Sequence, residues 1–458
     1  MAAFSPGAAT LEWYDLLAQD AIRSIQQHNL TSSGPRWNID ERSLSRRQSP
    51  IPEAASTTTY DASSVSSVVP EPWNTVNSII LSAEELVCFQ YYVNVVGPIL
   101  DLFDPAKHFT DMVPHLALRN VGLLKSLLAV AARHMSLHGV EVPVNGVQDP
   151  HTPNSTSSTV ERHAATRYYY DTLSYLSQAM AYPSYTKSLE ILATAVMIGT
   201  YEMFDGSNRD WERHLKGAFW IQRCQENNGE SGGLRMAVWW AWLRQDIWAA
   251  FRDRRKTLTI WRPTKPLAVL SPDELATRIL YLLAQVVQYA STEEMEATDI
   301  TTRIEQGNKL LKLLSDWHDI LPASFRPIPT GNDAKDRTYE PMWIHPPSHA
   351  AAIQYYHFAR ILLLLNQPSL GGINAYRVRQ TMLDESTKVI CGLASSSQSK
   401  QLPSVIVSFQ ALFAAGLCVP SGDKKAEVLE LFKGTLDTNK WPPKQSMIEV
   451  MDEWSKTL

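Results

Sequence analysis

The sequence predicts an all-α fold, a large multi-helix body preceded by a partly disordered N-terminal segment. Apolar residues recur at spacings of three and four in many segments, and helix-capping patterns precede several of these segments. Apolar and polar residues do not alternate over any strand-length run bracketed by turn residues. Hydrophobic residues make up 44% of the chain and charged residues 19%, a balance that supplies enough apolar surface for a helical core.

Half of the tryptophans, seven of fourteen, lie in one stretch between Trp211 and Trp261. Two helical patterns, at 209–226 and 234–256, are joined there by a Gly-rich turn at 229–233. Apolar residues surround most of the second pattern, and a helix of that kind is buried inside a large protein because one face alone cannot hide its rings from water. We therefore expect this pair of helices to form the centre of the core.

Helices are predicted from about residue 79 onward. Ser82-Ala83-Glu84-Glu85 is a capping-box pattern before an apolar segment, and Gly97-Pro98 is expected to end that helix. Ser271-Pro272-Asp273-Glu274 marks another start, with Ser as the cap and Pro in the first turn, where its missing N–H costs no hydrogen bond. The remaining predicted helices span 120–139, 160–181, 186–204, 299–319, 346–366, 376–394, 402–418, 424–435 and 444–456.

The chain is expected to divide into two parts at about residue 79. Residues 11–28 have the spacing of a short amphipathic helix, and eleven of the twenty-seven residues in 43–69 are Ser or Thr. A segment of that composition buries too little apolar surface to offset its ordering entropy, so we expect 1–78 to be a short helix and a largely disordered linker. Residues 79–458 are expected to form the all-helical domain.

Charge and cysteine content narrow the classes of partner and cofactor. A net charge of −5 and a pI near 6.2 argue against strong binding of a phosphate backbone by the chain itself. The four cysteines, Cys88, Cys224, Cys391 and Cys418, are too widely spaced to indicate a disulfide framework or a metal site. We expect no metal and no cofactor. No run of eighteen apolar residues and no secretory signal pattern occur, which favours an intracellular protein without a membrane span.

Eight residues in and beside the tryptophan-rich stretch are the candidate site. Charged side chains near a core are costly unless they are paired, so we predict a core polar network of buried or half-buried ion pairs, for example between Asp246 and an arginine of a neighbouring helix. The alternative is an effector pocket, in which the same polar groups and indole rings orient a small metabolite. The candidate residues are Glu202, Asp210, Arg213, Trp239, Trp242, Arg244, Asp246 and Trp248.

Three further motifs each have a plain structural interpretation. Segment 229–233 (GESGG) matches the G-x-S-x-G of hydrolases, with Ser231 in the nucleophile position, but a helix precedes it where that motif needs a strand. We predict a turn between helices, which needs glycine for its left-handed positions. The basic run 252–256 is a candidate nuclear import or phosphate-contacting signal, and a solvated helix end is the better prediction. His134 and His138 share a helix face without a third metal ligand at a suitable spacing, so no zinc site is predicted.

Several long segments carry a family resemblance. They include VVGPILDLFDPAKHF (95–109), PHLALRNVGLLKSLLAVAARHMSLHG (114–139) and TAVMIGTYEMFDGSNRDWERHLKGAFWIQRCQ (194–225), followed by 228–267, 343–369 and 408–416. In this order they resemble the fungal-specific regulatory domain of zinc-cluster transcription factors, the middle homology region. The resemblance covers most of the chain. It implies an all-helical regulatory module, a nuclear location and a role in controlling transcription, often of metabolic genes.

The sequence departs from this family at one element. Members of the family carry a binuclear zinc cluster of six cysteines upstream, whereas Cys88 is the one cysteine before residue 200 here. The resemblance and this departure together imply a transcriptional regulator of a metabolic or secondary-metabolite gene set that acts through protein partners. The expected partner is a second copy of the chain or a zinc-cluster transcription factor, so that DNA is contacted only indirectly. A small-molecule effector is a further expectation.

Two alternatives stay open. The first is a truncated form of a zinc-cluster DNA-binding transcription factor, whose cluster would be encoded upstream of Met1. The second is a helical enzyme, which is the weaker alternative because no paired nucleophile and base, metal cluster or phosphate loop is found in the sequence.

Overall fold

The computed structural model describes residues 71–139, 157–206, 208–329, 339–396, 402–419 and 423–441. Within these ranges the secondary structure is helical, and the β-pairing is limited to an isolated bridge between Asn74 and Asn120. The predicted all-α fold is confirmed. The predicted helices at 11–28 and 444–456 and the predicted linker at 43–69 lie outside the described ranges.

The N-terminal group of helices runs from α2 to α8. Its helices are α2 (Ala83–Tyr91), α3 (Gly97–Leu100), α4 (Val113–Ala117), α5 (Val121–His138), α6 (Ser157–Ala179), α7 (Leu189–Asp205) and α8 (Asn208–Cys224). Short 3₁₀-helical and π-helical turns connect several of these helices. These turns are η1 (Tyr92–Val96), η2 (Asp101–Phe103), η3 (His108–Met112) and η4 (Pro183–Thr186).

The second group follows from α9 onward. Its helices are α9 (Gly233–Arg252), α10 (Pro272–Tyr289), α11 (Thr292–Ala297), α12 (Ile300–Asp319), α13 (Pro347–Asn366), α14 (Ile373–Ala394), α15 (Leu402–Gly416) and α16 (Asp423–Asn439), with short turns η5 (Leu267–Val269) and η6 (Ala323–Phe325). The sequence prediction lacks α11, because six residues are too few to show a helical period.

The capping patterns mark helix starts that the structure shows. At α2 the Ser82 hydroxyl accepts the Glu85 amide at 3.2 Å, while the Glu85 carboxylate accepts the Ser82 amide at 3.1 Å. Ser271 and Glu274 form the same reciprocal pair at α10. Each pair satisfies amides that have no partner within the first helical turn, so these boundaries follow from local sequence alone. α5 ends as predicted at Gly139, whose φ of 64° suits glycine.

The expected end of the first helix at Gly97-Pro98 is wrong. The wide turn η1 precedes Gly97, and Pro98 falls in the first turn of α3, so the helical path continues to Phe103. In the wide turn η1 the Gly97 amide bonds to the Tyr92 carbonyl, and this local widening directly before Pro98 lets the helix accommodate a residue without an N–H. Among the described residues, Ala83–Phe103 is the one helical stretch long and apolar enough to cross a membrane, and 50% of its most apolar window is buried inside the fold.

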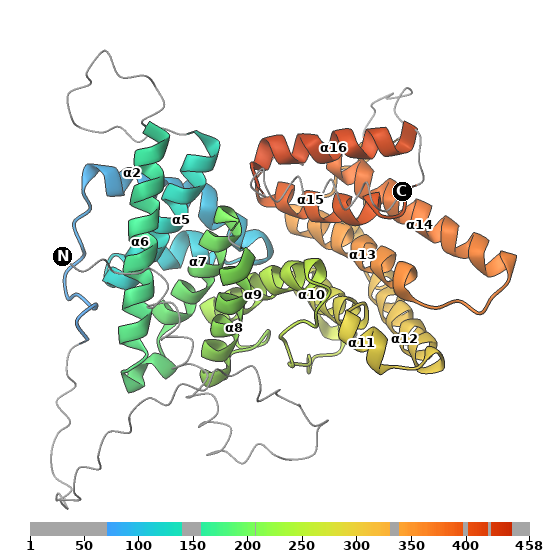
Figure 1. Ribbon diagram of the computed structural model, residues 1–458, viewed down its shortest axis with the longest axis horizontal. Coiled ribbons are helices and arrows are strands. Elements are labelled where there is room, and N and C mark those ends of the chain that lie inside the picture. The colour runs from blue at the N-terminus through green and yellow to red at the C-terminus, as the bar shows by residue number, and fades with distance from the viewer. Residues whose placement is uncertain are drawn as a thin grey trace, which may run out of the picture.

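Figure 1 shows the helices in two groups that meet at α9 and α10. In the first group α5 lies between α6 and α7 in its contacts, and α2 packs on α5. In the second group α13, α14, α15 and α16 pack against one another. α9 contacts α7 and α8 on one side and α10 on the other, so the tryptophan-rich helix links the two groups.

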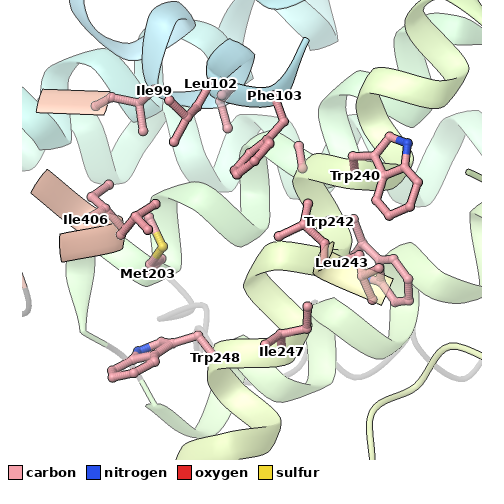
Figure 2. Packing of buried hydrophobic residues seen from close by; sticks show 14 of the residues in the cluster. Ile99, Leu102, Phe103, Met203, Trp240, Trp242, Leu243, Ile247, Trp248 and Ile406 are labelled. Atoms are coloured by element: carbon pink, nitrogen blue, oxygen red, sulfur yellow. The ribbon is translucent and has the colours of Figure 1, made fainter. Parts of the chain in front are cut away.

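The predicted centre of the core is confirmed at α9. Trp242 is fully buried, and Trp239, Trp240 and Trp248 are at most 6% exposed. In Figure 2, Trp240, Trp242 and Trp248 project from α9 in different directions, so the helix is covered on several sides. A helix with indoles on several faces has no face that can be exposed to water without a large loss of free energy. The helix is therefore buried inside the protein.

The C-terminal end of the described chain returns to the first group of helices. The indole N–H of Trp441 donates to the backbone carbonyl of Met203 in α7 at 2.5 Å. Its ring packs edge-on against Trp248 of α9 and Phe409 of α15. Trp441 is only 2% exposed, so the last described residue of the chain helps to close the core between α7, α9 and α15.

Candidate functional site

The eight candidate residues divide among separate groups of contacts, and Glu202 belongs to the first. Glu202 on α7 is 1% exposed, and its carboxylate contacts the Tyr169 hydroxyl of α6 and the His214 ring of α8. Both contacts are made by the same oxygen, Oε1, whereas Oε2 has no hydrogen-bond partner among the described residues. The contacts of Oε1 tie three helices together. Arg213 is half-buried beside His214 on α8. Asp210 also belongs to α8, but its side chain is not among those that the structure describes.

Asp246 forms the second group of contacts. Its carboxylate is fully buried on α9 and accepts the Arg255 guanidinium at 2.9 Å and the Leu258 amide at 2.7 Å. Burial raises the pKa of Asp246, and the positive charge of Arg255 opposes that shift. The predicted ion pair is present, but its arginine does not come from a neighbouring helix. α9 ends at Arg252, and the chain turns at Arg254, where φ is 51°, so that the next residue points back at the same helix.

Arg244 forms the third group. Its guanidinium donates to the backbone carbonyls of Ile99 at 3.3 Å and Leu100 at 2.8 Å, and it lies 5.6 Å from the centre of the Phe103 ring. The last carbonyls of a helix have no partner within the helix and attract cations. Arg244 therefore holds α3 and η2 in place against α9.

The three candidate tryptophans make the contacts of a packed core. The Trp242 indole N–H donates to the Leu215 carbonyl of α8 at 3.0 Å, and its ring lies 5.2 Å from that of Trp239. The Trp248 ring lies 5.7 Å from Phe409 and 5.9 Å from Phe413, both on α15. These rings join the two groups of helices, and an effector pocket among them stays a prediction.

A half-open cavity of about 280 Å³ lies nearby, where the two groups of helices meet. Residues 98–110 form one side, and the first turns of α10, α13 and α15 form the other; we call this space the seam cavity. Proline is favoured in the first turn of a helix, where no N–H is needed, and converging helix starts therefore give a proline-rich wall. The wall prolines are Pro98, Pro105, Pro346, Pro347 and Pro403.

Asp101 is the most deeply placed acidic group of the seam cavity, at 7% exposure. Its Oδ1 accepts the Phe109 amide at 2.8 Å, and its Oδ2 accepts the Thr110 amide at 2.7 Å and the Thr110 hydroxyl at 2.6 Å. Burial raises the pKa of Asp101 to about 6, even though these hydrogen bonds favour the charged form. Asp101 thus caps η3 and fixes the loop that forms one wall of the cavity.

The other charged groups of the wall are Asp104, Asp273 and Lys107. The Asp104 carboxylate accepts the backbone amide of His108 and contacts its ring Nδ1, each at 2.7 Å. Asp273, in the first turn of α10, is about half exposed and lies 3.8 Å from Nε2 of His349. Three carboxylates against one ammonium give the cavity an acidic wall.

Sequence reasoning missed the seam cavity. The pattern at 271–274 predicts a helix cap, and Asp101 and Asp104 lie in a segment that carries the family resemblance. Neither signal says that the two segments meet. They meet because α10 and α13 contact η2 in the folded chain. Sequence spacing does not express such a long-range contact.

The 229–233 segment is the predicted turn between α8 and α9. Ser231 is exposed, and its hydroxyl accepts the backbone amide of Asn228 at 2.9 Å, within the same turn. The Glu230 carboxylate accepts the Thr264 amide at 3.0 Å, which ties the turn to the chain before α10. A helix rather than a strand leads into this turn, so the strained elbow of a hydrolase is not formed here.

The basic run at the end of α9 is more than a solvated helix end. The Arg252 guanidinium lies 5.3 Å from the centre of the Phe413 ring, and Lys256 pairs with Glu294 at 2.7 Å. Arg255 holds Asp246, as described above. These cations therefore join α9 to α11 and α15, and the expectation of a purely solvated cluster is corrected.

His134 and His138 form a stacked pair on α5, with ring centres 4.4 Å apart. His134 is fully buried, and its Nδ1 lies 2.9 Å from the Tyr91 hydroxyl. Burial lowers the pKa of His134 to about 3, so the ring is neutral at physiological pH. Within the described part of the chain, no group of three or more His, Cys, Asp or Glu side chains is arranged to hold a metal ion.

Comparisons with known proteins show a similarity that covers part of this helical body. Residues 87–236 match the family model described as the fungal specific transcription factor domain. The chain is also 22% identical, over 503 aligned residues, to the protein named transcription activator AMTR1 from Alternaria alternata. That alignment covers 83% of this chain and 65% of the relative, so the chain spans less than two thirds of the relative's length. No solved structure matches the chain. The part from α2 to the start of α9 is therefore similar to a fungal specific transcription factor domain, in agreement with the first of the sequence segments that carry the resemblance.

Proposed function

We propose that the protein regulates transcription in the nucleus, and that its helical body is the regulatory part. One observation carries this proposal: a transcription factor domain at 87–236 coincides with similarity to a transcription activator over 83% of the chain. By the same resemblance, we propose that the controlled genes form a metabolic or secondary-metabolite set. The direction of control is activation, as in the name of the relative.

We further propose that this regulator reaches DNA through a protein partner, a second copy of the chain or a zinc-cluster transcription factor. Two properties of the sequence support this. Its net charge is −5, which disfavours strong contact with phosphates, and its four cysteines do not form a six-cysteine cluster. A second candidate is a longer form of the same chain that carries its own zinc cluster. The relative favours this candidate, because 35% of the relative's length lies outside the alignment, given the 65% that is covered.

A reporter assay tests the regulatory role. The full chain is joined to an unrelated DNA-binding domain, and transcription from a matching reporter is measured in a fungal cell. We expect transcription several-fold above that given by the DNA-binding domain alone. Trp242→Ala, which removes a fully buried indole, abolishes this effect, whereas Trp343→Ala, at a side chain 42% exposed, preserves it. An unchanged reporter with normally accumulating protein contradicts the proposal.

The same assay separates regulation from catalysis. Ser231→Ala removes the hydroxyl that a hydrolase would need as its nucleophile. Because that hydroxyl only accepts an amide within its own turn, we expect the variant to retain full reporter activity. A loss of reporter activity together with loss of ester hydrolysis by the purified protein favours the enzyme alternative instead.

Two measurements separate the routes to DNA. Affinity purification from nuclear extract, followed by mass spectrometry, is expected to recover a zinc-cluster protein or a second copy of the chain. Peptides that precede Met1 and carry six cysteines indicate the longer form. Mobility shifts with the purified chain at physiological salt complete the test, because tight and sequence-specific binding by the chain alone contradicts the need for a partner.

A further inference from the structure

The seam cavity has the shape of a preformed small-ligand site. Its volume, about 280 Å³, is close to the lower end for ligand pockets, roughly 300 Å³. Five prolines stiffen the wall, and the Phe103 ring and Leu102 supply apolar surface. Arg244 donates hydrogen bonds to the carbonyls of Ile99 and Leu100, which directly precede Leu102 and Phe103 in the chain. These bonds hold the apolar wall in place on the side away from the cavity. Little conformational freedom is left for a ligand to remove.

The charges of the wall select the sign of the ligand. Asp101, Asp104 and Asp273 line the cavity, and Lys107 supplies the one ammonium group of the wall. Asp101 accepts hydrogen bonds from two amides and a hydroxyl. Within the part of the chain that the structure describes, no cation lies within ion-pair distance of it, and the Arg244 guanidinium behind the wall acts on its charge only at longer range. Its carboxylate oxygens have four lone-pair sites, so they can accept one more donor. A buried carboxylate with no cation within ion-pair distance favours a positively charged ligand.

The helix starts around the cavity do not reverse this preference. Free amides at a helix start attract anions. At α10, however, Ser271 and Glu274 already accept and donate in a capping box, and Asp273 adds a negative charge to the same turn. The nearby turn η3 is capped by the Asp101 carboxylate. At α10 and η3, the amides that would bind an anion are therefore occupied by acidic side chains of the protein itself. The start of α13 has no side-chain cap, and its first residues, Pro346 and Pro347, have no N–H to offer an anion.

We propose that the seam cavity binds a small organic cation, a protonated amine with a short apolar body. The ammonium group lies between Asp101 and Asp273, and the carbon body lies against Phe103 and the prolines. The ligand contacts residues 98–110 on one side and the first turns of α10 and α13 on the other. Binding therefore joins the two groups of helices and stabilises the folded chain by mass action. This binding is independent of whether the protein controls transcription.

Three matched probes test the charge requirement with the purified full chain. Phenethylamine, 2-phenylethanol and phenylacetate share an aromatic body and differ mainly in charge. Calorimetry and the thermal midpoint are measured with each. We expect binding and a raised midpoint with phenethylamine, and neither with the alcohol nor with the acid. Equal binding of the amine and the alcohol, preferential binding of the acid, or no binding by any probe overturns the proposal.

Variants of the wall test the location. Asp101→Asn is expected to weaken phenethylamine binding by about tenfold or more, because hydrogen bonds to charged groups are worth about 1.5–3 kcal/mol. Asp273→Asn, at the half-exposed rim, is expected to weaken it by about threefold. Ser348→Phe fills the cavity and is expected to abolish binding. Asp101 also fixes residues 109 and 110, so Asp273→Asn and Ser348→Phe carry the test alone if Asp101→Asn does not fold.

A matched control removes an acidic group elsewhere. Glu293→Gln lies in the first turn of α11, as Asp273 lies in the first turn of α10, but it does not line the cavity. This variant is expected to bind phenethylamine as tightly as the unmodified chain. If Glu293→Gln weakens binding as much as Asp273→Asn, or if Ser348→Phe leaves binding unchanged, the amine binds at another place and the proposal is wrong.

Discussion

The ring of Tyr175 in α6 lies directly against Gly122 in α5. A β-carbon added to Gly122 would come within 2.0 Å of ring atoms Cδ1 and Cγ. Tyr175 is 7% exposed, and its ring has Trp73 packed edge-on at 5.5 Å, so it has little room to move aside. The close approach of α5 and α6 therefore requires glycine at position 122.

Gly122→Ala is expected to lower the free energy of unfolding by about 2 kcal/mol, because overfilling a packed interior forces side chains from their preferred rotamers. Urea unfolding of the purified protein measures the change. Gly434→Ala in α16 is the matched control, since nothing lies within 4 Å of its added β-carbon. There alanine is expected to raise stability by up to about 1 kcal/mol. Equal effects at the two positions contradict the close packing at Gly122.

Trp242 is expected to be among the most costly tryptophans to remove. It is fully buried, and its indole N–H satisfies the Leu215 carbonyl. Trp242→Ala is expected to lower the free energy of unfolding by about 3–5 kcal/mol. Trp343→Ala, at a ring 42% exposed, is expected to change it by about 0.5 kcal/mol or less. Thermal and urea unfolding of both variants provide the check, and similar losses would show that burial at α9 is not the cause.

The Asp246–Arg255 pair is expected to show strong coupling in a double-mutant cycle. Arg255→Met leaves the fully buried Asp246 carboxylate without its counter-charge, at a cost of about 3 kcal/mol or more. Adding Asp246→Asn is expected to recover much of that loss, because the amide has no charge to compensate. Lys312→Met, which breaks an exposed pair with Asp316, is the control and is expected to cost less than about 1 kcal/mol. Additive effects at Asp246 and Arg255 would rule out the coupling.

Acid is expected to destabilise the fold through His134. In the unfolded chain this ring takes up its proton near pH 6.5, whereas burial in the folded chain, next to the stacked His138, lowers the pKa to about 3. Between these values the unfolded state binds more protons, so the free energy of unfolding falls as the pH decreases from 6.5 toward 3. Urea midpoints measured at pH 7, 6 and 5 follow this loss.

Two glutamine variants identify the histidine responsible. Gln at position 134 retains a partner for the Tyr91 hydroxyl but has no titrating group. His134→Gln is therefore expected to lose less stability between pH 7 and pH 5 than the unmodified chain. His115→Gln, at an exposed histidine of α4, is expected to follow the unmodified chain. An unchanged pH slope in His134→Gln would assign the loss to other groups, such as His357, whose pKa burial also lowers to about 3.

Local signals in the sequence predict helix starts and the centre of the core well. Ser82 and Ser271 bond to residues three positions away, so their capping needs nothing from the rest of the chain. The indoles of α9 are too large to leave in water, whichever helices cover them. The prediction at Gly97-Pro98 fails because the wide turn η1 lies directly before Pro98 and lets the helical path continue, and apolar spacing does not show such a wide turn.

The polar contacts are harder to predict, because they depend on which segments meet. Glu202 is correctly placed near the core, but its partners Tyr169 and His214 come from α6 and α8 and have no pattern that links them to it. The seam cavity has the same difficulty, since Asp101 and Asp273 belong to segments that meet only after folding. Residue type and spacing show that a charge needs a partner, and the tertiary fold decides which partner it has.

The contact between Trp441 and the Met203 carbonyl has a consequence for synthesis of the protein. The ribosome makes α7 long before it makes residue 441, so during translation the faces of Trp248 and Phe409 that receive this indole stay uncovered. Nascent chains with such apolar surface are bound by chaperones and aggregate when left unprotected. A premature stop codon shortly before Trp441 would thus yield an incompletely closed polypeptide that cellular quality control removes, even though almost every helix had been translated.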